Sequence, residues 1–295
     1  MSKLNIMALR HSAFYSPFLM TMAGGFLTEE GLDFEYKVES PECTVAESFA
    51  NGSCHLAQSA VAASFASLER GETQNLVHFA QINSRDGFFI ASRIPDPAFS
   101  WQKLVGKRVL VDHFFQPLAM FQYALHQQGI ELDDIQAVNA GDVVAIEQAF
   151  RDGQADYVHM QGPAPQQMEH DGMASVVAMV GDVVGPVAFS SLCATRDWLK
   201  TDQAGAFCRA YQKSLNYVIE APAKEIASRH QEAGFFPEID RQVLTNTIDA
   251  YLKLGCWQSD MKIPEEAYEN LLNVFLFSGA ITQRHPYEQV ISPPA

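Results

Sequence analysis

The feature that most constrains the fold is a repeated alternation of short strand-like runs and helical patterns between residues 104 and 161. The strand-like runs occupy residues 109–111, 136–139 and 155–160, and the helical patterns occupy 118–128 and 143–151. Short apolar runs bounded by turn residues are typical of strands buried on both faces. This β-α-β-α-β order predicts a parallel sheet with right-handed crossovers. Open α/β sheets bind their ligands at the carboxyl ends of such strands.

The same alternation precedes this stretch, and helices follow it after residue 197. Strands are predicted at 4–9, 34–38, 55–59, 76–81, 87–92 and 185–194, and carboxyl-terminal helices at 198–219, 241–254 and 265–277. Two prolines within residues 94–97 coincide with a change in composition. We therefore predict that the chain crosses from one lobe to the other nearby. We predict a discontinuous first lobe, residues 1–91 and 192–295, around a second lobe of residues 92–191. The fold class is α/β, with two mixed sheets, two crossover segments and a helical carboxyl-terminal region.

Charge and cysteine content exclude several classes of protein. The 295-residue chain has a formal net charge of −15, whereas a nucleic-acid-binding surface needs clustered Lys and Arg. Its five cysteines are far apart, form no C-x-x-C pair and lack zinc-like spacing with histidines. This pattern favours reduced thiols over disulfide or metal chemistry. We expect no nucleic-acid partner, no metal and no cofactor.

The amino terminus bears on location. Residues 1–10 lead straight into a strand pattern, without the apolar stretch of a secretory signal. No apolar run reaches the roughly 18 residues of a transmembrane helix. As it stands the sequence predicts a cytoplasmic protein, and a periplasmic or membrane-associated location would require that a leader has been removed.

Several short motifs together resemble a known family. They are Pro17-Phe-Leu, the run GFLTEEGLD at 25–33, Asn51-Gly52, Arg70-Gly71, the run LVGKRV at 104–109, Ala155-Asp156 and Asp197-Trp-Leu. Their order and spacing are similar to those of the type II periplasmic binding proteins for nitrate, alkanesulfonates and thiamine precursors, the NMT1/THI5-like family. The resemblance covers nearly the whole chain, from Leu4 to about Tyr287. It implies two α/β lobes that close on a small ligand, and an ABC-type permease as partner.

The family also contains yeast-type synthases that make the thiamine pyrimidine, and this sequence departs from them. Ser59 stands where the synthases carry the lysine that holds pyridoxal phosphate, and Ala63 where they carry the histidine consumed as substrate. The run 185–191 lacks the cysteines that they carry before the returning strand ends. Without an amine for a Schiff base or thiolates for iron, we predict a binding protein with no catalytic residues.

The loop after residues 109–111 bears on the charge of the ligand. A phosphate cradle needs glycine-rich backbone at a helix amino terminus, and here the loop reads Asp112-His-Phe-Phe-Gln-Pro117. The Asp112 carboxylate would repel a phosphate dianion, so we do not expect a phosphorylated ligand, and the two phenylalanines favour an apolar or ring-shaped one. Because Arg10 is the one strong candidate cation, we predict a thiamine-precursor-like pyrimidine or another neutral or cationic heteroaromatic, in preference to nitrate or a sulfonate.

Candidate ligand-binding residues follow the strands of both lobes, where they would face a common cleft. They are Arg10, His11, Tyr15, Gln58 and Ser59 in the first lobe, Asp112, His113, Gln116, His159 and Gln161 in the second, and Phe189 and Ser190 on the returning crossover. His159 and Gln161 are polar groups in an otherwise apolar strand, where an unpaired group is costly. Three plainer alternatives stay open: Arg10 as a solvated surface residue, Ser59 as a helix cap and Phe189 as a core residue.

Two other functions fit the same residues. His11, His113, His159, Asp112 and Asp156 would also supply an acid–base set. A cytoplasmic enzyme of this fold, synthase-like or a small-molecule lyase, is therefore one alternative, and a cytoplasmic ligand sensor is another. No pair among these residues has the spacing of a catalytic motif. We expect a monomeric solute-binding protein of an ABC-type uptake system.

Overall fold

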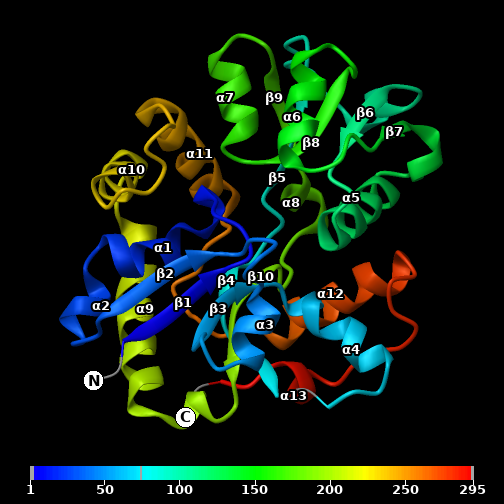
Figure 1. Cartoon of the computed structure of the whole chain (residues 1–295). Helices are drawn as coiled ribbons and strands as arrows, with labels where there is room; N and C mark the ends of the chain where they lie inside the picture. Colours follow the sequence, from blue (N-terminus) through cyan, green and yellow to red (C-terminus); the bar gives the residue numbers. More distant parts are fainter. Residues whose placement is uncertain (1–2, 74, 294–295) are drawn as a thin grey trace.

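The computed structural model describes residues 3–73 and 75–293, which form two α/β lobes, one above the other in Figure 1. Each lobe is built on a mixed five-stranded sheet. The first sheet has the strand order β2-β1-β3-β10-β4, and the second has the order β7-β6-β8-β5-β9. Helices flank both sheets, so the structure confirms the predicted fold class.

The first sheet is parallel except for one strand. Its strands are β1 (Leu4–Ala8), β2 (Phe34–Val38), β3 (Leu56–Ser59), β4 (Leu76–Asn83) and β10 (Ser190–Thr195), and its early helices are α1 (Ser16–Ala23), α2 (Phe26–Glu29), α3 (Val45–Ala50) and α4 (Phe65–Glu69). β10 runs antiparallel between β3 and β4. A strand from late in the chain therefore fills the gap between two early ones.

The second sheet contains the predicted parallel unit. Its strands are β5 (Phe88–Ser92), β6 (Arg108–Val111), β7 (Gln136–Val138), β8 (Tyr157–Gln161) and β9 (Ser175–Met179), and its helices are α5 (Phe115–Gln127), α6 (Val143–Arg151), α7 (Ala164–His170) and α8 (Val180–Val184). β6 pairs in parallel with both β7 and β8. The carboxyl ends of these three strands therefore meet at one edge of the sheet, which faces the first lobe.

The chain crosses between the sheets at residues 84–87 and 185–189. These crossings lie a few residues before the boundaries that the sequence predicts, after residues 91 and 191, because 88–92 pairs as β5 with β8 and β9. The long strand predicted for 185–194 is wrong in its first half. Gly185 adopts a φ of 74°, and pairing with β4 begins only at Ser190.

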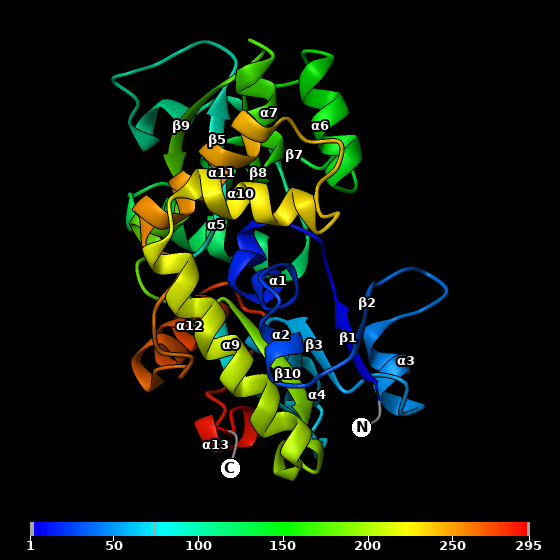
Figure 2. The ribbon, with the colours of Figure 1, turned by 90° about the vertical axis from the view of Figure 1, so that its left-hand side faces the viewer.

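The carboxyl-terminal helices hold both lobes. They are α9 (Asp202–Glu220), α10 (Ala223–Glu232), α11 (Arg241–Leu254), α12 (Glu265–Phe277) and α13 (Tyr287–Val290). α9 packs along α1 and α2 of the first lobe, whereas α11 reaches α7 and α12 reaches α5 in the second lobe (Figure 2). At the α5 contact the rings of Phe115 and Phe275 lie edge to face, 4.9 Å between centroids. Within the described ranges, no helix is long and apolar enough to cross a membrane.

Candidate functional site

A cavity of about 770 Å³ lies between the two lobes, a volume typical of small-molecule sites. The loop after β1 contributes Arg10 and His11 to its wall. The loop after β6 contributes Asp112 and His113, and the end of β8 contributes Gln161. The structure thus brings together side chains from both lobes at the strand ends where the sequence predicts them.

A second, narrower space adjoins this main cavity. This inner pocket measures about 50 Å³ and shares Arg10, Phe114 and Gln161 with the main cavity. Its other predicted residues are Tyr15, Gln58, Gln116, Phe189 and Ser190. Ten of the twelve candidate residues therefore line one space or the other.

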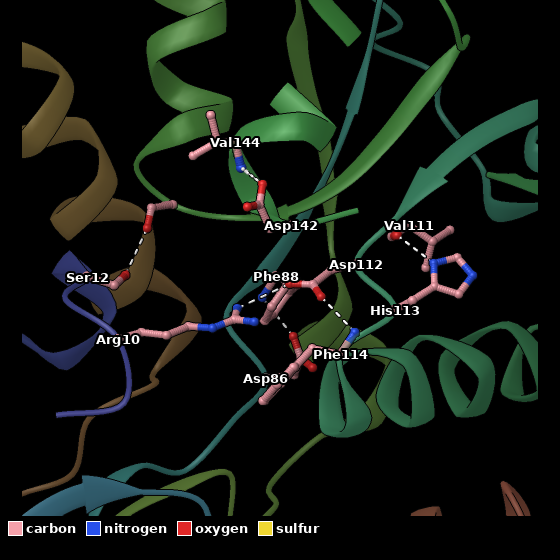
Figure 3. Close-up of polar contacts among 11 residues, drawn as sticks. Arg10, Ser12, Asp86, Phe88, Val111, Asp112, His113, Phe114, Asp142 and Val144 are labelled. Carbon is pink, nitrogen blue, oxygen red and sulfur yellow. Dashed lines mark hydrogen bonds and ion pairs between the residues drawn. The ribbon is translucent and has the colours of Figure 1, made fainter. Parts of the chain in front are cut away.

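A salt bridge joins the lobes across the main cavity. Arg10 Nη1 lies 3.1 Å from Asp112 Oδ2 (Figure 3), and the Arg10 guanidinium lies over the Phe114 ring, 4.9 Å from its centroid. The other Asp112 oxygen accepts a hydrogen bond from the Phe114 backbone N–H, at 2.9 Å. Arg10 is therefore a partly buried residue at the cavity, and its charge is already matched by a carboxylate.

The remaining charges of the main cavity are negative. Asp142 lines the cavity and caps α6, since its Oδ1 accepts from the N–H groups of Val144 and Ala145 at 3.1 and 2.9 Å. Glu147 also lines it and pairs with Arg151 at 2.8 Å. Among the described residues of the cavity wall, Arg10 is the only Lys or Arg against three carboxylates. The amino terminus of α6, which lines the cavity, is thus closed to an anion by its own cap.

Both histidines of the cavity wall have protein partners. A ring nitrogen of His11 lies 3.0 Å from the Tyr36 hydroxyl, and the His11 ring lies 4.5 Å from that of Phe236. Burial lowers the pKa of His11, so its ring is neutral at pH 7. His113 Nδ1 donates to the Val111 carbonyl at 2.8 Å.

The wall of the inner pocket is mostly apolar, with a few polar side chains placed among aromatic rings. The Tyr15 hydroxyl forms hydrogen bonds with the side chains of Gln161 and Ser190, and burial raises the pKa of Tyr15. Gln58 accepts from the N–H groups of Leu9 and Arg10 at 3.1 and 3.4 Å and donates to the Ser59 carbonyl at 3.3 Å. Gln58 therefore holds the loop that presents Arg10 and has little capacity left for a ligand.

Two predicted residues, Ser59 and His159, line neither space. Successive side chains of a strand point to opposite faces, so Ser59 faces away from the pocket that its neighbour Gln58 lines, and it bonds the Cys193 thiol instead. It caps no helix either, because the following 3₁₀ turn begins after Ala60.

His159 is enclosed in the second lobe. Its ring stacks between Phe88 and Phe121, with 4.6 Å between centroids on each side. The side chain is fully buried, and burial lowers the pKa of His159 to about 3. We therefore leave Ser59 and His159 out of the proposed site.

Several cavity residues escape the sequence analysis. Ser12 lines the cavity and its Oγ donates to the Gly162 carbonyl at 2.9 Å, a second polar contact between the lobes. Asn139 and Asp142 follow β7 at the same sheet edge as Asp112. The strand-end rule would have found them if it had been applied to 136–139 as well. Phe114 and Val144 stay 60% and 73% exposed at the cavity, which leaves apolar surface for a ligand.

Comparison with known proteins agrees with this architecture. Residues 13–225 match the family described as NMT1/THI5 like. The protein YtlA of Bacillus subtilis (strain 168), named as a binding protein, is 27% identical over 99% of this chain and 88% of its own. Two solved structures cover the chain at 14% identity. They are the ligand binding component of an ABC-type import system from Staphylococcus aureus (TM-score 0.78; 99% of this chain, 97% of that one) and the periplasmic aliphatic sulphonate binding protein SsuA from Escherichia coli (TM-score 0.77; 100% and 93%).

These three proteins are named for binding and not for catalysis, which agrees with the prediction of a protein without catalytic residues. The solved structures share the two-lobed fold at low identity, so they bear on architecture and not on the ligand. The family match extends over most of the chain, from η1 (Ala13–Tyr15) into α10. The chain therefore belongs to the NMT1/THI5-like family and has the fold of its two-lobed binding proteins.

Proposed function

We propose that this protein is the solute-binding component of an ABC-type uptake system, and that its ligand is a neutral or cationic heteroaromatic such as a thiamine-precursor-like pyrimidine. The observation that carries the proposal is the Arg10–Asp112 salt bridge across the cavity. An anion would have to take Arg10 away from Asp112 and then lie beside an unpaired, mostly buried carboxylate. Leaving such a charge unpaired is costly. A cation or a neutral donor instead finds acceptors.

The rest of the main cavity supports the same class of ligand. Asp142 adds negative charge to its wall and occupies the α6 terminus where an anion would otherwise bind, while Glu147 is paired with Arg151. The Phe114 ring is exposed and already carries the planar Arg10 guanidinium. A flat, positively polarised ring suits that surface, because cations and aromatic rings attract each other over the ring face.

A thermal-shift panel tests this assignment. We expect thiamine-pathway pyrimidines to raise the melting temperature, and nitrate and aliphatic sulfonates to leave it unchanged. A ligand present at about one hundred times its Kd stabilises the folded state by about 2.7 kcal/mol. Recovery of the ligand unchanged after incubation, measured by mass spectrometry, separates a binding protein from an enzyme of this fold. Stabilisation by the anions alone would overturn the assignment.

Substitution of Arg10 is expected to change the affinity for a cationic ligand and the affinity for an anionic ligand in opposite directions. Arg10→Gln frees Asp112, so we expect a cationic pyrimidine to bind severalfold more tightly to this variant. Asp112→Asn removes the negative charge and one of the two acceptor oxygens, and is expected to weaken binding of the same ligand about tenfold, the effect of a charge-assisted hydrogen bond. Isothermal titration calorimetry measures both.

The exposed pair Lys200 and Asp197, 2.9 Å apart on the surface, supplies matched controls. Lys200→Gln and Asp197→Asn change the net charge as the test variants do, and we expect them to leave the Kd unchanged. If Arg10→Gln abolishes binding of the pyrimidine instead, Arg10 supports binding itself, and the proposal that a cationic ligand replaces Arg10 at Asp112 is wrong.

A further inference from the structure

We propose that the inner pocket is a subsite selective for N–H donors, in which the side-chain carbonyl of Gln116 accepts a hydrogen bond from an amino or amidine group of the ligand. The inference rests on the proposed function, because it requires that the ligand lies in the cleft between the lobes. It goes further by assigning the chemistry of one end of the ligand and the residue that selects it.

Gln116 lies in the first turn of α5 and is 4% exposed. Its Nε2 donates to the Phe189 carbonyl at 2.9 Å. This bond fixes the orientation of the amide, because the flipped amide would set two carbonyl oxygens against each other. The carbonyl Oε1 is buried and has no hydrogen-bond partner among residues 3–73 and 75–293. Gln116 lines the inner pocket, and the atom of its amide that lacks a partner is the acceptor and not the donor.

The other polar groups of the pocket are engaged with one another. The side-chain amide of Gln58 forms hydrogen bonds with the backbone of Leu9 and Ser59. The Tyr15 hydroxyl forms hydrogen bonds with the side chains of Gln161 and Ser190. The Gln116 Oε1 atom is thus left as an open acceptor in a pocket where every other named amide or hydroxyl has a partner. Buried acceptors are seldom left unpaired in folded proteins, so a donor on the ligand is the natural complement.

The size of the pocket limits what enters it. About 50 Å³ holds a few waters or one small substituent, but not a ring. The rings of Phe88, Phe114 and Phe189 line it, so the substituent enters between aromatic groups while the ring of the ligand stays in the main cavity. A sulfonate or nitrate oxygen in the same place would meet Oε1 acceptor to acceptor and be rejected.

Ligand pairs that differ in one group test the subsite. The first pair is 4-amino-2-methylpyrimidine and 2,4-dimethylpyrimidine, which have nearly the same shape but exchange an amino for a methyl group. The second pair is taurine and propane-1-sulfonate, which makes the same exchange without a ring. For the pyrimidine pair we expect calorimetry to show at least about tenfold tighter binding of the amino member, the effect of pairing one buried acceptor. For the sulfonate pair we expect no binding of either member.

The Gln116→Leu variant keeps the size of the side chain and removes the acceptor, so we expect the preference for the amino member to fall to less than about twofold. Gln166→Leu is the matched control. Gln166 is also a buried glutamine whose Oε1 has no partner in the described chain, but it lines neither the main cavity nor the inner pocket. We expect this variant to keep the full preference.

The outcomes distinguish failure of the proposed heteroaromatic ligand from failure of the proposed donor subsite. If both pyrimidines bind the unchanged protein equally well, the cleft binds heteroaromatics but the donor subsite is wrong. The same conclusion follows if Gln116→Leu folds, as circular dichroism reports, and keeps the preference. If neither pyrimidine binds while propane-1-sulfonate or nitrate does, the proposed function fails and the subsite fails with it. Tight binding of taurine alone, lost in Gln116→Leu, would retain the subsite and overturn the heteroaromatic ligand.

Discussion

An Asp86→Asn variant is expected to gain about 3 kcal/mol of stability over the unchanged protein between pH 5 and pH 8. Asp86 lies in the first crossing between the lobes and is fully buried. Burial raises the pKa of Asp86 from 3.8 to about 7. Its Oδ1 accepts from the Phe88 N–H at 2.7 Å, and its Oδ2 has no partner among the described residues. The folded protein therefore keeps a proton that the unfolded chain has released.

The direction of the effect follows from that proton. A carboxyl group whose folded-state pKa is raised contributes stability that is fully present below its unfolded pKa and is lost as the pH rises through its folded pKa. Asparagine resembles the neutral carboxyl at every pH, so the variant escapes this loss. The buried histidines His78, His159 and His230, whose pKa values burial lowers to about 3, act in the opposite direction, but they are present in both proteins and cancel in the difference.

Urea unfolding of both proteins at pH 5, 6, 7 and 8 measures this difference. Asp182→Asn removes an exposed carboxylate from nearby α8 and controls for the loss of one negative charge. A difference in unfolding free energy that stays constant from pH 5 to pH 8 would show that folding does not raise the pKa of Asp86.

The second large effect is expected at Gly181, where two backbone segments meet at the same crossing. A Cβ atom on Gly181 would lie 2.2 Å from the backbone oxygen of Asp86 and 3.2 Å from Arg85 Cβ. Because backbone cannot rotate away as a side chain can, α8 and the crossing must move apart. We expect Gly181→Ala to lower the free energy of unfolding by about 1–3 kcal/mol, the range of overpacked interiors.

Gly205 is the matched control for that substitution. It lies inside α9, and the nearest atom to a Cβ there is Arg209 Nη1 at 3.6 Å. Alanine in a helix interior is favoured over glycine, so Gly205→Ala is expected to raise the free energy of unfolding by about 0.5–1 kcal/mol. Chemical denaturation of both variants checks the pair. Equal effects at the two positions would contradict a steric role for Gly181.

The elements with local signals could be predicted from the sequence, and those that depend on distant pairing could not. The helices predicted at 143–151, 241–254 and 265–277 begin and end at those residues. For the first two, Asp142 and Asp240 cap the amino termini, and apolar residues recur on one face. By contrast, nothing within residues 87–92 shows which sheet they join. Their pairing with β8 depends on residues 157–161, so the crossings were misplaced by a few residues.

The candidate site divides in the same way. The position of a residue at a strand end is a local property, and it identifies Arg10, Asp112 and Gln161. Which face a side chain occupies depends on packing, and that is why Ser59 and His159 were included. The salt bridge between Arg10 and Asp112 joins residues 102 positions apart. Two further features follow only from three-dimensional proximity. They are the preference of the site for a neutral or cationic ligand, which depends on this salt bridge, and the unpaired acceptor on Gln116.

The place of β10 between β3 and β4 has a consequence for how the protein is made. All strands of the second sheet have been synthesised by residue 179. The first sheet lacks β10 until residue 195 has left the ribosome. The upper half of the molecule can therefore acquire its shape during translation before the half that contains the start of the chain. In that interval β3 and β4 present open edges to each other, and such edges recruit foreign strands. Slowed translation across residues 180–195 should accordingly favour aggregates of nascent chains over soluble protein.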